Sequence, residues 1–148
     1  MKGNSSALRK GRFSESGRIY LVTFVTYQRT PIFHDFGCGR IVVSSMRFLT
    51  TLSDTLAYVI MPDHVHWLVE LRDGSLERSV HSLKSFSAKE INKKLGWSGH
   101  IWQKGFHDHA IRDEEDLTEI ARYIVMNPIR AGLVKSCREY ALWDAVWV

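Results

Sequence analysis

The sequence contains two pairs of histidines in which a single residue separates the two members. The pairs are His64–His66 and His107–His109, and both lie in segments with the residue types of β-strands. Residues two apart on a strand point to the same side, so each pair can offer two imidazoles to one divalent metal ion. The spacing does not choose between the pairs, and an incidental HxH pattern is the alternative for both.

Tyr123 and Asn127 lie one helical turn apart near the end of a predicted helix. The buried face of that helix is indicated by apolar residues at helical spacing, namely Leu117, Ile120, Ala121 and Ile124. Tyr123 falls at the border of this face, where a tyrosine can pack its ring on the core and present its hydroxyl to a cleft. A border tyrosine without a chemical role fits the same pattern.

Short strands and longer helices have to position these side chains. Strands are predicted over 19–26, 56–61, 64–71 and 106–112, and helices over 39–52, 75–95 and from a cap at Asp113 to about Asn127. The Pro62-Asp63 turn favours an antiparallel hairpin. The order of the elements predicts the α+β class with a ferredoxin-like split βαβ arrangement (β-α-β-β-α-β plus a further C-terminal helix). We expect an antiparallel sheet with helices on one face.

The composition is that of a soluble globular protein. The 148 residues suffice for one domain, and 45% are hydrophobic and 24% charged. The sequence contains no run of about 18 uncharged apolar residues, the length that a membrane span requires, and no signal peptide is recognised. Cys38 and Cys137 form no CxxC pattern, which excludes a cysteine-based zinc module and favours reduced thiols in the cytoplasm.

The basic side chains are concentrated near the start of the chain. The net charge of +4 weakly favours an anionic partner. Residues 1–17 are rich in serine, glycine and basic side chains, which predicts a basic flexible arm, with a solvated tail as the alternative. Residues 18–148 are expected to form a single domain.

Two sequence blocks resemble a known family. The run Met61-Pro62-Asp63-His64-Val65-His66-Trp67-Leu68 resembles the HUH motif (histidine, hydrophobic residue, histidine) of single-tyrosine transposases. Residues 102–109 and 121–134 resemble the REP-associated tyrosine transposases, which are relatives of insertion-sequence transposases that process single-stranded DNA hairpins. The resemblance extends from about residue 18 to 147. Residues 1–17 depart from the longer, more aromatic start of that family.

The resemblance implies a set of roles. His64 and His66 would be metal ligands, Asn127 would complete the metal site, and Tyr123 would be the nucleophile. Mg²⁺ or Mn²⁺ suits such a mixed donor set. The implied reaction is cleavage and transfer of single-stranded DNA with a hairpin (a palindromic repeat) through a 5′-phosphotyrosine, by a monomer or a homodimer. His107 and His109 would then be structural or DNA-facing.

Several side chains are expected to contact the DNA. Those that could follow phosphates are Lys84, Lys89, Arg112 and Arg130, and Trp102 could stack on bases. An ordinary solvated helix face is the alternative for each lysine. No Gly-x-x-x-x-Gly-Lys loop is present, so no nucleotide cofactor is expected.

Two other functions fit the same fold. One is a domesticated protein that binds hairpin DNA without cutting it. The other is a small RNA-binding domain, which is disfavoured because the strands lack an RNP-type pair of aromatic residues.

Overall fold

The fold is built on a five-stranded antiparallel sheet. The computed structural model describes residues 17–112 and 116–147. The strands are β1 (Ile19–Val25), β2 (Ser53–Met61), β3 (His64–Leu71), β4 (His107–Ala110) and β5 (Trp143–Ala145). They lie in the order β4-β1-β3-β2-β5, and every neighbouring pair is antiparallel. The first four strands have the ferredoxin-like order, so the predicted fold class is confirmed.

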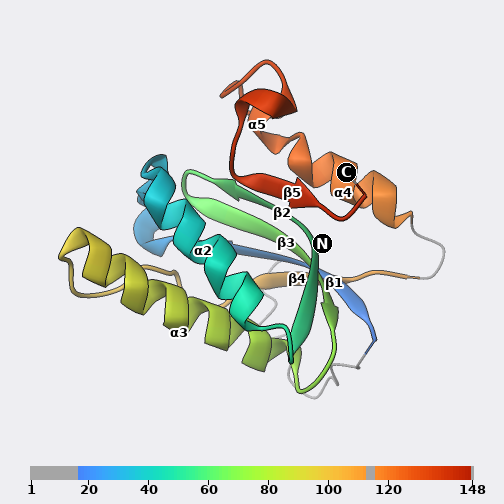
Figure 1. Ribbon diagram of the computed structural model, residues 1–148, viewed down its shortest axis with the longest axis horizontal. Coiled ribbons are helices and arrows are strands. Elements are labelled where there is room, and N and C mark those ends of the chain that lie inside the picture. The colour runs from blue at the N-terminus through green and yellow to red at the C-terminus, as the bar shows by residue number, and fades with distance from the viewer. Residues whose placement is uncertain (1–16, 113–115, 148) are drawn as a thin grey trace.

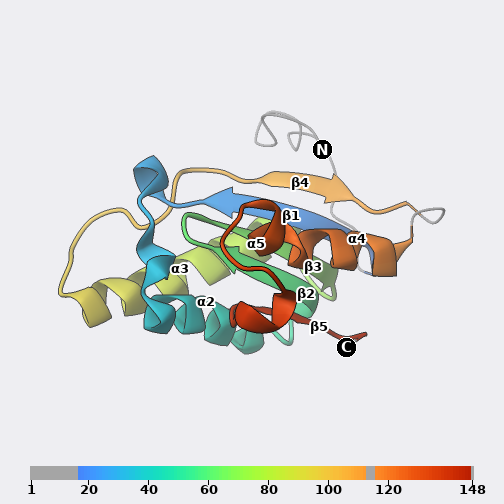
Figure 2. The same ribbon diagram turned by 90° about the horizontal axis from the view of Figure 1, so that it is seen from above.

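The longer helices cover opposite faces of this sheet. They are α2 (Phe36–Phe48), α3 (Leu76–Leu95) and α4 (Leu117–Val125), followed by the short α5 (Asn127–Arg130). Figures 1 and 2 show α2 and α3 side by side on one face and α4 on the other. The two ferredoxin-like helices share a face as expected, whereas the last helix covers the opposite face. Three short 3-10 turns, at Tyr27–Arg29, Ile32–His34 and Cys137–Glu139, complete the connections.

Each face of the sheet has its own apolar core. The larger core packs odd-numbered residues of β3, such as Val65 and Trp67, against α2 and α3. The smaller core joins Leu68 of β3 and Val59 of β2 to Ile124 of α4. Because side chains alternate along a strand, His64 and His66 lie on the same face as Leu68, under α4.

Helix ends account for most differences from the sequence-based expectation. Ser75 caps α3 and Gly96 ends it in the left-handed region, as the pattern predicts. Helix α4 is capped by Asp116, whose side chain accepts from two backbone N–H groups, rather than by Asp113. Asp113 and the arm at 1–16 lie outside the described residues.

Helix α2 begins earlier than predicted. Asp35 caps it by accepting from the N–H of Cys38, although two glycines follow within the first turns. Gly39 is needed there, because a Cβ atom at this position would collide with the side chain of Leu142, just before β5. The described residues include no helix that is long and apolar enough to cross a membrane.

We expect Gly39→Ala to destabilise the fold. The added methyl meets the buried Leu142, and overpacking of this kind costs about 1–3 kcal/mol. The better helix propensity of alanine offsets about 1 kcal/mol of this cost. Urea unfolding measures the loss.

Gly37→Ala is the matched control, because its Cβ would meet only the flexible, partly exposed side chains of Lys94 and Asp35. This variant should be neutral or more stable. A Gly39→Ala protein as stable as the wild type would show that the segment before β5 packs loosely on α2.

Candidate active site

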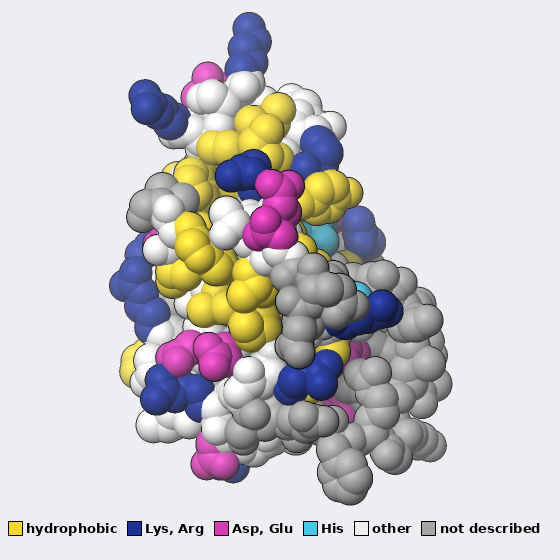
Figure 3. Space-filling view, turned by 90° about the vertical axis from the view of Figure 1, so that its right-hand side faces the viewer, with side chains coloured by type: hydrophobic (Ala, Val, Ile, Leu, Met, Phe, Trp, Pro, Cys, Tyr) yellow, Lys and Arg dark blue, Asp and Glu magenta, His cyan; other side chains and the backbone are white. Residues whose placement is uncertain are grey.

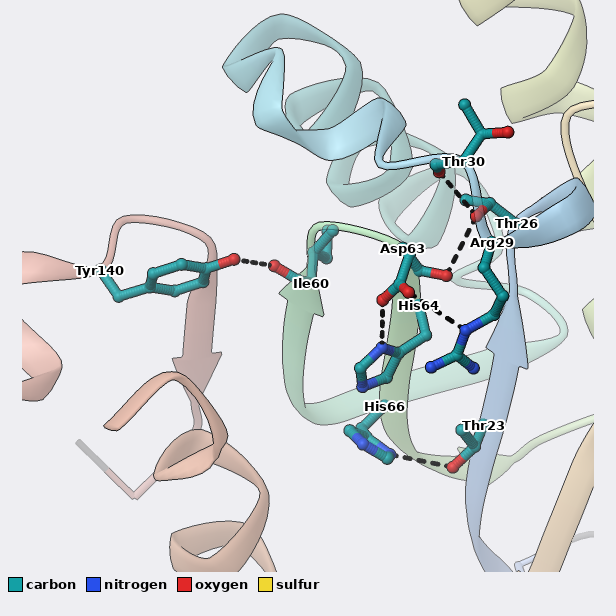
Figure 4. A network of polar contacts seen from close by, with 9 residues as sticks. All are labelled: Thr23, Thr26, Arg29, Thr30, Ile60, Asp63, His64, His66 and Tyr140. Carbon is teal, nitrogen blue, oxygen red and sulfur yellow. Dashed lines mark hydrogen bonds and ion pairs between the residues drawn. The ribbon is translucent and has the colours of Figure 1, made fainter. Parts of the chain in front are cut away.

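His64 and His66 lie next to each other on the central strand β3. Their partners on β2 are Met61 and Val59, which belong to the core under α4. The two ring centroids are 5.0 Å apart and the ring planes are at 86°. Figure 4 shows both rings on one side of β3. The structure therefore brings the two imidazoles together, as their spacing predicts.

A hydrogen bond holds each ring through its Nδ1 atom. Asp63 Oδ1 lies 2.8 Å from His64 Nδ1, and Thr23 Oγ1 lies 2.9 Å from His66 Nδ1. An ionised carboxylate can only accept, so Nδ1 of His64 carries the proton and Nε2 keeps its lone pair when the ring is neutral. Both bonds use Nδ1, so Nε2 is the atom that each ring can offer to a metal.

Asp63 is itself held in place by the chain that follows β1. Arg29 Nε lies 3.1 Å from Asp63 Oδ2, and the buried Thr26 donates to the backbone carbonyl of Asp63 (Figure 4). Burial pushes the pKa of Asp63 upward, but the hydrogen bond to His64 and the charge of Arg29 outweigh it and hold the pKa below its ordinary value. Asp63 is therefore an ionised acceptor at neutral pH.

The ring of His66 is half-buried on β3. Burial, together with the nearby charges of His64 and Arg130, lowers the pKa of His66 to about 4. The ring is therefore neutral at physiological pH, which is the form that binds metals.

Tyr123 extends into solvent from the last turn of α4. Its side chain is 65% exposed. The guanidinium of Arg130 lies over the ring, 3.9 Å from its centroid, and Arg130 Nη2 donates to the backbone carbonyl of Tyr123 at 2.6 Å. The ring of Tyr123 is thus on the outer side of the helix and is covered by Arg130, rather than packed on the core as the border position predicts.

Asn127 does not share a continuous helix with Tyr123. Helix α4 ends at Val125, and Asn127 is the first residue of α5, with Pro128 directly after it. The predicted i, i+4 alignment on one helix is therefore wrong, because the helix breaks at Met126 ahead of the proline. Asn127 Nδ2 donates to Ile124 O at 2.9 Å, which leaves its amide oxygen as the atom suited to a metal.

The second histidine pair lies on the same face of the sheet as the first. His107 and His109 on β4 pair with Thr23 and Leu21 on β1. Strand β1 separates them from β3, and neighbouring strands are about 4.8 Å apart, so the pairs are separated by about 10 Å. Each pair is thus a separate group of two imidazoles.

Two of the predicted DNA contacts are corrected by the structure. Trp102 is buried, packs edge-on against Phe24 and donates its indole N–H to Ser87, so it cannot stack on a base. The ammonium of Lys84 is bound to the backbone carbonyls of Gln103 and Gly105, so it joins α3 to the following loop. Both residue types suit nucleic acids, but here Trp102 belongs to the larger core and Lys84 holds the loop that follows α3.

The remaining predicted contacts are exposed but scattered. Lys89 is on α3, which packs on the face opposite the histidines. Arg112 follows β4, and Arg130 ends α5. Figure 3 shows the side of the molecule seen from the right of Figure 1, where histidine side chains appear beside Lys and Arg side chains.

Sequence reasoning missed the residues that orient the imidazoles. Asp63 is adjacent to His64, so a carboxylate beside a candidate ligand was an available signal. Thr23 pairs with His66 across β1 and β3, a relation that requires the strand register. Arg29 lies in the short 3-10 turn after β1, and the spacing of apolar residues in the sequence does not predict the conformation of such a turn.

The donor set fits a metal ion that keeps open positions. Among residues 17–112 and 116–147, no three His, Cys, Asp or Glu side chains are grouped closely enough to bind a metal by themselves. Two imidazole nitrogens leave room for phosphate oxygens, water and a further protein ligand. Such a set suits chemistry on a phosphate better than a closed structural site.

The chain resembles known transposases in sequence and in fold. A family model described as "Transposase IS200 like" matches residues 16–127. The REP-associated tyrosine transposase of Escherichia coli K12 is 32% identical over 89 residues, which cover 57% of this chain and 49% of that protein. A Haemophilus influenzae protein whose name assigns it to the same kind of transposase is 32% identical over 99 residues. These residues cover 59% of this chain and 56% of that protein. The chain therefore spans about half the length of the curated relatives it matches.

A solved structure supports the likeness in fold. It is a REP-associated tyrosine transposase bound to a REP hairpin, with a TM-score of 0.70 and 23% identity, covering 89% of this chain and 79% of that chain.

We expect the half-buried His66 to make the metal-free protein less stable in mild acid. The folded ring has a pKa of about 4, and the unfolded ring has the ordinary value near 6.5. Between these values the unfolded chain binds more protons than the folded protein. The free energy of unfolding is therefore highest above about pH 6.5 and falls as the pH drops toward 4. The loss is at most about 3 kcal/mol, and less where solvent reaches the ring.

NMR titration of the imidazoles and urea unfolding from pH 7 to 4.5 measure this effect. His66→Gln should flatten the pH dependence, and His81→Gln, at an exposed position on α3, should not. A His66 ring that titrates near pH 6.5 in the folded protein would contradict the prediction.

Proposed function

The chain belongs to the IS200-like transposase family, and we propose that it cleaves and rejoins single-stranded DNA at hairpin-forming sequences. The observation that supports this most is the pair of oriented imidazoles under α4, whose last turn bears an exposed tyrosine. A likeness to a structure that contains a REP hairpin favours a hairpin as the DNA partner.

Tyr123 is the proposed nucleophile. Its phenol oxygen attacks the scissile phosphorus, a bond forms between them, and the bond to the 3′ oxygen breaks. The phenol proton is lost and the leaving oxygen gains a proton, which gives a 5′-phosphotyrosine and a free 3′-hydroxyl. The reverse reaction with another 3′-hydroxyl transfers the strand, and no ATP is required because the phosphotyrosine conserves the bond energy.

His64, His66 and Asn127 are the proposed ligands of Mg²⁺ or Mn²⁺. When bound there, such an ion would polarise the phosphate and offset its growing negative charge. The neutral His66 offers a lone pair without first losing a proton, and Asp63 fixes the direction of the His64 lone pair. Arg112 and Arg130 remain proposed phosphate contacts, and Lys89 could serve only DNA that reaches the α3 side.

A covalent adduct tests the proposed nucleophile. Incubation with hairpin-flanked single-stranded DNA and Mn²⁺ should give a protein–DNA adduct that survives denaturing electrophoresis. Tyr123→Phe removes the attacking oxygen, so the adduct should disappear while hairpin binding persists. Tyr27→Phe, at another exposed tyrosine, is the matched control and should keep the adduct.

His64→Ala separates catalysis from folding. It should abolish the adduct and leave hairpin binding largely intact. If the wild type and the variants all bind the hairpin but form no adduct, the result would favour a domesticated protein that binds DNA without cutting it. An adduct that persists in Tyr123→Phe would show that another residue is the nucleophile.

Asp63→Asn should weaken metal binding without removing a ligand. The neutral amide oxygen accepts the Nδ1 proton more weakly than a carboxylate does, and loss of such outer-shell partners lowers metal affinity by about 10- to 100-fold. Isothermal titration with Mn²⁺ measures this change. Asp54→Asn removes a carboxylate paired with Arg72 instead and should leave the affinity unchanged; equal effects of the two variants would refute the role of Asp63.

A further inference from the structure

Arg130 makes two different contacts with Tyr123. Its Nη2 atom donates to the backbone carbonyl of Tyr123 at 2.6 Å, and its guanidinium carbon lies 3.9 Å from the centroid of the phenol ring. A cation above a ring face is attracted by the negative charge of that face. One side chain thus holds both the backbone and the ring of Tyr123.

The break between α4 and α5 makes these contacts possible. The last carbonyl groups of a helix need donors from outside the helix, and the carbonyl of Tyr123 is in the last turn of α4. Arg130 is seven residues later, at the end of α5, and it reaches back across the corner formed at Met126. The position of the phenol therefore depends on the folded corner as well as on α4.

We propose that Arg130 is the positioning residue of Tyr123, which holds the backbone and the phenol ring at the α4–α5 corner in one orientation for attack on the scissile phosphate. This inference rests on the proposed function, because it takes Tyr123 as the nucleophile. It goes beyond a phosphate contact, because the guanidinium also acts on the approach of the phenol oxygen. Lysine cannot replace it, because an ammonium group is not planar and cannot stack on a ring while it donates to a carbonyl, as the guanidinium group does.

The kinetics of adduct formation test this role. Arg130→Lys keeps the charge and loses the stacking, so the rate at saturating DNA should fall roughly 10- to 100-fold, as expected for a misplaced reacting group. The DNA concentration that gives half the maximal rate should change little. Arg122→Lys is the matched control, because Arg122 is next to Tyr123 in the sequence but pairs with Glu119, and it should keep the wild-type rate.

NMR of the protein without DNA or metal gives an independent readout. The Nε–H proton of Arg130 should be shifted upfield by the ring beneath it, and Tyr123→Leu should remove the shift. The ring signals of Tyr123 should move toward those of an unstructured tyrosine in Arg130→Lys and stay in place in Arg122→Lys. Thermal unfolding of each variant reports any general loss of folding.

The outcomes separate this inference from the proposed function. A wild-type protein without any adduct refutes Tyr123 as nucleophile and with it the positioning role, whatever the NMR shows. An adduct whose rate at saturating DNA is unchanged in Arg130→Lys overturns the role of Arg130 alone. A loss confined to DNA affinity would also overturn it, and would make Arg130 a phosphate contact only.

Discussion

The proposed site depends on holding the half-buried ring of His66 on a central strand in a neutral and oriented form. A polar ring that loses solvent is costly unless it is hydrogen-bonded. Thr23 supplies that bond from the neighbouring strand β1, and the pairing of Thr23 with His66 is set by the β1–β3 register. A shift of one residue in this register would turn the side chains to the wrong faces and remove the partner. The sheet is thus part of the site and not merely its support.

The two faces of the sheet have different roles, because one packs the main core and the other bears the proposed active site. The larger core, under α2 and α3, contains most of the buried apolar residues. The face under α4 has a smaller core and carries the polar residues of the proposed reaction. Substitutions at the α4–α5 corner can therefore change the chemistry at small cost to the main core.

The elements that sequence reasoning predicted well are those with strong local signals. Strand β3 has the predicted limits because the Pro62-Asp63 turn precedes it and apolar residues continue through it. Helix α3 has the predicted limits because Ser75 caps its start and Gly96 ends it. Strand β5 was missed because three residues are too few to show a period. Trp102 was misjudged because a tryptophan in a polar loop looks exposed, and only the fold places it against Phe24.

In the candidate site, too, the features with a local sequence signal were predicted and those that depend on the fold were not. The side-by-side imidazoles follow from the spacing of two residues on a strand, whereas the contact of Arg130 with Tyr123 depends on a helix break that the spacing does not reveal. Thr23 and Arg29 act through long-range contacts, so one sequence alone gives no local sign of them.

The outer strands of the sheet are its shortest. Strand β4 has four residues and β5 has three, so neither edge offers a long row of open backbone groups. Proteins commonly use short outer strands to prevent sheets of separate molecules from joining edge to edge. Copies of this chain that associate would accordingly meet through helices or loops rather than by continuing one sheet into the next.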